Sequence, residues 1–130
     1  MRNTLCGILV LLCIGSHLLW ADMTVKDYRE RFPQGQLTPT DTVQRLVAFA
    51  YIEGVGHGIQ TASVVARIQG NKQLYCIPDK LILTGENYMG MIDREIKEQA
   101  RIESEEVLGK RPLGVVLLYA LTETFACPSK

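Results

Sequence analysis

The chain is poor in the residues from which catalytic metal sites and nucleic-acid surfaces are usually built. It has two histidines in 130 residues, and its 14 basic residues are balanced by 14 acidic ones. A chain without net positive charge lacks the basic surface that nucleic acids require. The sequence also shows no internal repeat, no low-complexity tract and no glycine-rich phosphate loop between a strand and a helix. These absences argue against a protein that binds nucleic acid and against a phosphate-binding loop.

The apolar stretch at the N-terminus is too short for a stable membrane anchor. Arg2 precedes an apolar core from Leu5 to Ile14, and a cleavage site is expected after Ala21. This is the layout of a secretory signal peptide. The alternative, a retained anchor, would need an apolar run of roughly 20 residues. We therefore expect cleavage of residues 1–21, a periplasmic location, and a single helical domain over residues 22–130.

Only two cysteines remain once the leader is removed, because Cys6 and Cys13 belong to it. In an oxidising compartment the remaining pair, Cys76 and Cys127, is expected to form one disulfide. It would close a loop of about 50 residues, worth about 4 kcal/mol in the chain-entropy model. A disulfide sulfur cannot act as a nucleophile with His57, and the spacings match no usual zinc site. We therefore expect no enzyme activity, no cofactor and no metal.

The fold is predicted to be all-α, a compact bundle of about four helices. Apolar residues recur at steps of three and four between proline and glycine clusters. Helices are expected over residues 22–32, over 38–69, from Thr84 as cap to about residue 100, and from 112 or 113 to 125. Apolar residues on all sides of the last helix predict that it is buried.

The helix over residues 38–69 carries a row of small residues at four-residue steps, which includes Gly54, Gly58 and Ala62. Such a row lets another backbone approach closely. We expect close packing against a helix of the same chain, with a subunit interface as the alternative. The apolar residues from Val43 to Ala66 are expected to share this one buried face.

Residues 103–111, between the last two predicted helices, mix both charge signs around Gly109. This composition predicts an exposed loop, and exposed loops between well-packed helices are common binding elements. Its charged residues are the candidates for partner binding: Glu103, Glu105, Glu106, Lys110 and Arg111. By contrast, the charged face between Asp93 and Arg101 is interpreted as solvated helix surface.

Several short segments occur in an order that resembles a known family. They are Tyr51 to Val55, Cys76 to Pro78, Ala120-Leu121 and Phe125 to Pro128. Together they resemble the Tai/Rap family of type VI secretion immunity proteins over residues 43–128. The resemblance implies a small periplasmic all-helical homodimer that binds a peptidoglycan amidase effector and occludes its active site with a protruding loop. Relatives often have a further cysteine pair, whereas this chain has Ala48 and Ala50 near one of those positions.

Two other functions are open at this stage. A small periplasmic chaperone of the acid-stress type shares the size, the leader and the single disulfide. The chain could also be an exported effector or a structural protein of the envelope.

Overall fold

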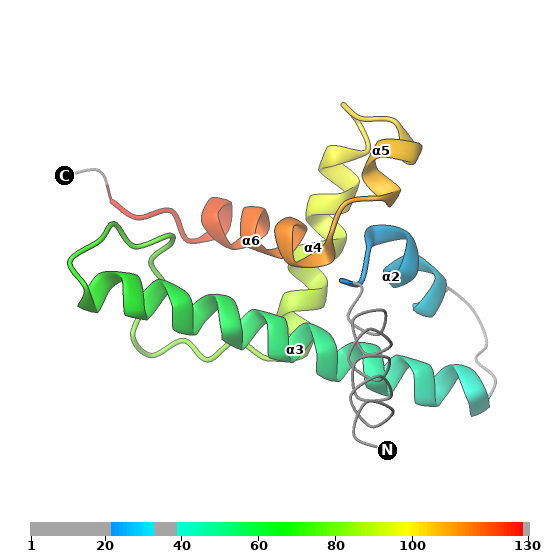
Figure 1. Ribbon diagram of the computed structural model, residues 1–130, viewed down its shortest axis with the longest axis horizontal. Helices are drawn as coiled ribbons and strands as arrows, with labels where there is room; N and C mark the ends of the chain where they lie inside the picture. The colour runs from blue at the N-terminus through cyan, green and yellow to red at the C-terminus, as the bar shows by residue number, and fades with distance from the viewer. Residues whose placement is uncertain (1–21, 33–38, 129–130) are drawn as a thin grey trace, which may run out of the picture.

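The computed structural model describes residues 22–32 and 39–128, so the predicted signal peptide lies outside the described residues. The described part forms helices and one isolated β-bridge, and the expected all-α fold is confirmed. The helices are α2 (Val25–Arg31), α3 (Pro39–Ile68), α4 (Gly85–Gln99), α5 (Glu105–Gly109) and α6 (Leu113–Thr124). In Figure 1, α3 runs along the base, α6 lies above it, α4 crosses both, and α2 and α5 lie together at one end.

The helices begin where the sequence offers a cap. Thr24 precedes α2 and forms a capping box with Asp27, in which each residue's side chain accepts from the other's backbone N–H. Thr84 precedes α4, as predicted, and its N–H donates to Asn87 Oδ1 at 2.9 Å. These bonds satisfy backbone donors that the first helical turn leaves free.

The core lies where α4 crosses α3 and α6. Tyr88, Ile92 and Ile96 of α4 are buried, and α4 contacts both α3 and α6. Gly56 makes the crossing with α3 possible, since a Cβ built at this position would lie 2.3 Å from the Tyr88 ring. Further large side chains of the core come from the other four described helices: Val25, Tyr28, Ile52, Leu108, Leu113, Val116, Leu117 and Leu121.

The predicted packing face of α3 is wrong for its row of small residues, although Tyr51, Val55 and Ile59 pack against the core as expected. A Cβ placed at Gly54 or Gly58 would have no heavy atom within 4 Å, and both glycines, like Ala62, are exposed. The buried face instead contains Ala48, Ile52, Gly56 and Ser63. The helix has apolar residues on two faces, and the row of small residues belongs to the face that this chain leaves uncovered. The exposed apolar side chains on that face are Val43, Leu46, Val47, Val65 and Ile68.

The prediction for α6 is also only partly right. Leu113, Leu117 and Leu121 are buried, but Val115 and Tyr119 are exposed on the opposite side. The helix is therefore covered by α3 and α4 on one side rather than enclosed.

The predicted disulfide joins Cys76 to Cys127, with a Cα–Cα distance of 4.9 Å. It connects the segment that follows α3 to the chain just after α6. A hydrogen bond of 2.7 Å from Cys76 N to Phe125 O lies beside it. The disulfide thus holds the C-terminal end of α6 against the connection between α3 and α4.

Candidate partner-binding site

A tight turn between α4 and α5, residues 100–104, forms a corner at the end of the molecule opposite the disulfide. Ile102 N donates to Gln99 O at 3.1 Å and Glu103 N to the same oxygen at 3.0 Å, which ends α4 abruptly. Ser104 then caps α5, accepting from Val107 N. This geometry places Ile102 at the tip of the corner, where 82% of its surface is exposed. The corner stands above the helical body in Figure 1.

A chain of polar contacts lies directly beneath the corner. Gln99 Nε2 donates to Glu95 Oε1 at 2.6 Å, and both residues are 8% exposed. Arg111 then donates from one nitrogen to Gln99 Oε1 and from Nη2 to Glu103 Oε1, the latter at 2.8 Å. The Arg111 and Glu103 side chains are only 22% and 26% exposed. Because hydrogen bonds to charged groups strengthen away from water, this chain of contacts holds the corner in one arrangement.

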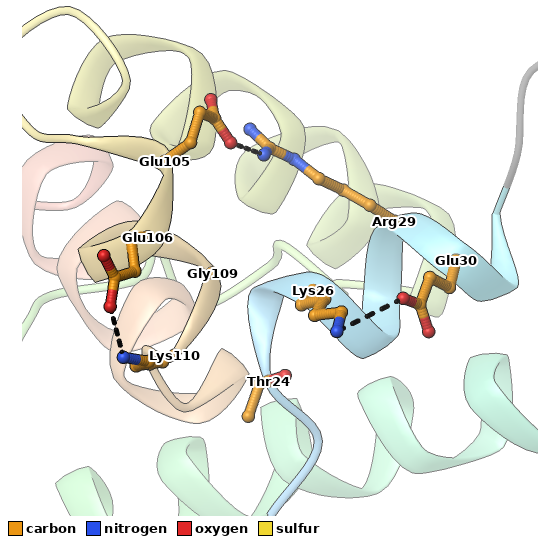
Figure 2. Close-up of a pocket in the computed structure, with 8 residues that line it drawn as sticks. All are labelled: Thr24, Lys26, Arg29, Glu30, Glu105, Glu106, Gly109 and Lys110. Carbon is orange, nitrogen blue, oxygen red and sulfur yellow. Dashed lines mark hydrogen bonds and ion pairs between the residues drawn. The ribbon is translucent and has the colours of Figure 1, made fainter.

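Alongside the corner, α2 and α5 enclose a cleft of about 510 Å³ (Figure 2). Arg29 of α2 pairs with Glu105 of α5 across it. Two further pairs lie along single helices, Lys26 with Glu30 at 3.9 Å and Lys110 with Glu106 at 2.7 Å. All six side chains are well exposed, so each pair contributes at most about 1 kcal/mol to stability. These ion pairs can therefore be broken at little cost in free energy. The same side chains can then pair with charged groups of a binding partner.

The position of α2 beside α5 is set by its backbone. Val25 N donates to Arg111 O at 3.0 Å, and Leu113 N donates to Met23 O at 2.7 Å. These bonds form the isolated bridge between Thr24 and Pro112. Within α2, the Thr24 backbone and side-chain hydrogen bonds hold the pKa of Asp27 below its ordinary value of 3.8. The α2 wall of the cleft is therefore fixed at its N-terminal end.

The five predicted partner-binding residues fall into two groups. Glu105, Glu106 and Lys110 are exposed and line the cleft. Glu103 and Arg111 instead pair with each other beneath the corner. The expectation of an open loop over residues 103–111 is wrong, because residues 105–109 form α5 and Arg111 is half-buried. The favourable first-turn charges Glu105 and Glu106 after Ser104 were the signal for this helix.

Sequence reasoning missed the α2 side of the cleft and the tip of the corner. Lys26, Arg29 and Glu30 lie in a short polar stretch for which no function could be argued, and only its place beside α5 makes them part of a site. Ile102 lies between Arg101 and Glu103 in the sequence. A single apolar residue among charged ones was the only sequence feature that could have indicated an exposed apolar side chain here.

The described residues hold no group of three or more histidine, cysteine, aspartate or glutamate side chains placed to bind a metal ion. Cys76 has no free thiol, because it is bonded to Cys127. His57 is exposed on α3, with its ring edge-on to Tyr88 at a centroid distance of 6.0 Å. No helix in the described ranges is long and apolar enough to cross a membrane.

Comparisons with known proteins found no matching family model, no matching curated protein and no matching solved structure. Function is therefore inferred from the geometry above and from the resemblance of the sequence segments.

Proposed function

We propose that this chain is a periplasmic immunity protein of the Tai/Rap type, exported by a cleaved signal peptide. In this proposal it binds a peptidoglycan amidase effector and protects the producing cell from its own toxin. The observation that carries the proposal is Ile102, a large apolar residue exposed at the tip of a corner that is held from beneath. Occlusion of an enzyme cleft needs a protruding anchor of this kind.

The mechanism is steric and requires no chemistry from this chain. Binding energy at protein interfaces is concentrated in a few central anchors surrounded by polar contacts that exclude water. Ile102 would be such an anchor, entering the amidase cleft. The charged residues of the α2–α5 cleft, Arg29 and Glu105 among them, would form the polar rim. The Glu95–Gln99–Arg111–Glu103 contacts keep the corner ordered before binding, which lowers the entropic cost of association.

The proposal is tested by comparing two equally exposed isoleucines. Ile102 is 82% exposed and Ile82, in the connection between α3 and α4, is 84% exposed. Each would be replaced by aspartate, and inhibition of peptidoglycan hydrolysis would be measured with the product of an adjacent gene where that gene encodes a papain-like amidase. Ile102→Asp should weaken inhibition at least about tenfold, a loss of about 1.4 kcal/mol.

Ile82→Asp is the matched control and should inhibit as the wild type does. Thermal melts of both variants should agree with the wild type, since neither side chain packs in the core. Unchanged inhibition by Ile102→Asp would exclude the corner as the occluding element. Failure of the wild-type protein to bind the amidase would remove the immunity function itself.

The proposal includes a homodimer that forms through the uncovered face of α3. This face presents small residues at Ala50, Gly54, Gly58 and Ala62 along a helix of 30 residues. A helix of that length spans about 45 Å, and small side chains allow a second helix to approach closely. The exposed side chains of Val43, Val47, Val65 and Ile68 would be covered in the dimer, whereas Leu46 lies at the edge of this face.

Sedimentation equilibrium of two glutamate variants tests this interface. Gly58 on α3 and Gly90 on α4 are both exposed, and a Cβ at either position would have nothing within 4 Å. Gly58→Glu would place a charge in the interface and should give a monomer. Gly90→Glu should remain a dimer, and a dimer in both variants would rule out this face.

The second candidate is an acid-stress chaperone, and the uncovered apolar face of α3 also favours it. A chaperone would use Val43, Leu46 and Val47 to hold unfolded clients rather than a second copy. Protection of a client from aggregation at about pH 2 to 3, together with apolar-dye binding, would support this function. An immunity protein should protect no client under these conditions.

A further inference from the structure

A second concave surface is lined by residues of α2, α3 and α4, and Arg29 lies on both this surface and the α2–α5 cleft. Two hollows of about 370 and 620 Å³ share Phe32, Arg45 and Met89, and so form one continuous groove between α2, α3 and α4. We call this the α2–α4 groove. Its floor is apolar at one end, where Leu46 and Phe49 join Met89.

The other end of the groove carries three cations against one carboxylate. Arg29, Arg45 and Lys97 line it together with Asp93. Asp93 Oδ1 accepts a hydrogen bond of 2.7 Å from the Tyr28 hydroxyl, and Arg29 is paired with Glu105. No carboxylate of the described residues lies within 4.0 Å of Lys97 Nζ. This end of the groove therefore has an excess of positive charge.

Arg45 is held in a position that suits carboxylate binding. Its guanidinium lies over the Phe32 ring, 5.3 Å from the centroid. A guanidinium is attracted to the face of an aromatic ring, and its fork of N–H donors matches the two oxygens of a carboxylate. Phe32 in turn packs against Tyr28, with ring centroids 5.0 Å apart.

We propose that the α2–α4 groove is a docking site for an acidic peptide segment that carries a large apolar side chain next to its carboxylates. The apolar side chain would cover Leu46, Phe49 and Met89, and a carboxylate would lie between Arg45 and Lys97. The arrangement of charge favours this ligand. The cations lie together beside the apolar floor and do not form the extended basic stripe that a polyanion would need. Asp93 and, at the apolar end, Glu86 disfavour a polyphosphate backbone.

Fluorescence anisotropy with two synthetic peptides tests the proposal. The probe is a fluorescein-labelled peptide in which two aspartates flank one tryptophan, and its control has both aspartates replaced by asparagine. The acidic peptide should bind with saturation below about 1 mM, and the amide peptide at least about tenfold more weakly. This comparison uses the wild-type protein and does not depend on how any variant folds.

Charge reversal then locates the binding site. The double variant Arg45→Glu with Lys97→Glu should lose at least about tenfold in affinity for the acidic peptide. Lys72→Glu, an exposed lysine just after α3, is the control and should bind as the wild type does. Circular dichroism verifies that all three proteins are equally helical.

Three results of the binding measurements would overturn the proposal. They are equal binding of the acidic and amide peptides, wild-type affinity in the double variant, and no saturable binding of the acidic peptide up to about 1 mM. If the wild type binds no peptide and the double variant becomes a monomer, the groove is a surface for self-association. This result would also overturn the proposal. The proposal does not rest on the amidase as partner, so its failure leaves the comparison of Ile102 with Ile82 unaffected.

Discussion

Three glycines of α3 provide a quantitative test of which face of this helix the core covers. Gly54, Gly56 and Gly58 are two residues apart, and successive residues turn by about 100° around the helix. Gly54 and Gly58 therefore share one face and Gly56 lies on the opposite one. A Cβ at Gly56 would lie 2.3 Å from the buried Tyr88 ring, whereas nothing lies within 4 Å of a Cβ at the other two positions.

Alanine substitution should therefore change stability in opposite directions on the two faces. In a helix interior, alanine is favoured over glycine by about 1 kcal/mol, so Gly54→Ala and Gly58→Ala should each stabilise by about that amount. Gly56→Ala gains the same propensity but forces a contact more than about 1 Å closer than the optimum of about 3.5 Å. Overpacking costs about 1–3 kcal/mol or more, and the Tyr88 ring is fully enclosed. A net loss of about 2 kcal/mol is expected.

Urea unfolding followed by circular dichroism measures these differences. The experiment should be run at a protein concentration at which sedimentation gives a monomer, so that changes in association do not enter. For a chain of this size, 1 kcal/mol corresponds to about 4 °C, so thermal melts should differ by about 12 °C between Gly54→Ala and Gly56→Ala. If Gly56→Ala is as stable as the wild type, or Gly54→Ala loses more than about 1 kcal/mol, the assignment of faces is wrong.

Four further outcomes are expected. The disulfide spans 51 residues, and its reduction should lower the free energy of unfolding by about 4 kcal/mol. Urea unfolding with and without dithiothreitol measures this, and a difference under about 1 kcal/mol would contradict it. Tyr88→Phe should raise stability by up to about 1 kcal/mol, because the buried hydroxyl has no hydrogen-bond partner among the described residues. Thermal melts measure this change, and a lower melting temperature than that of the wild type would contradict it. Arg111→Ala should destabilise the fold by about 2 kcal/mol, whereas the exposed control Lys110→Ala should cost at most about 0.5 kcal/mol. Equal losses in the two variants would show that the contacts beneath the corner contribute nothing to stability. The pKa of Asp27 is lowered from its ordinary value of 3.8, so its ionised form stabilises the fold above that value and this contribution is lost as the pH falls through the lower folded pKa. The difference in melting temperature between wild type and Asp27→Asn should therefore shrink as the solution is acidified below pH 3.8, and a difference that stays constant would contradict this.

Four of the five described helices and the disulfide could be predicted, because their signals are local or involve few choices, whereas α5 was expected to be a loop. Thr84 as a cap and the glycine and proline clusters bound the helices to within a few residues of their observed ends. The pairing of Cys76 with Cys127 required no geometry, since only two cysteines follow the predicted leader. These signals do not depend on how the helices pack.

The burial of α3 could not be predicted in the same way. Apolar and small residues occur on two of its faces, and periodicity alone does not say which face meets α4. The deciding feature is the fit between Gly56 and the Tyr88 ring, two residues 32 positions apart in the sequence. The α2–α5 cleft was missed for a related reason. Its two walls are separated in sequence by the whole of α3 and α4. They meet through backbone bonds around Thr24 and Pro112 and through the Arg29–Glu105 pair.

The two proposed functions require different surfaces of the protein. One pair of variants can therefore distinguish between them. Occlusion of an enzyme requires a single anchor on a rigid support, which is the situation of Ile102 above the Gln99–Arg111 contacts. Holding unfolded clients requires a broad apolar surface, which only the uncovered face of α3 offers among the described helices. Ile102→Asp should therefore weaken amidase inhibition without affecting client protection. Val47→Asp should reduce client protection without affecting amidase inhibition. A protein in which Val47→Asp abolished client protection at low pH, while Ile102→Asp changed neither activity, would be a chaperone.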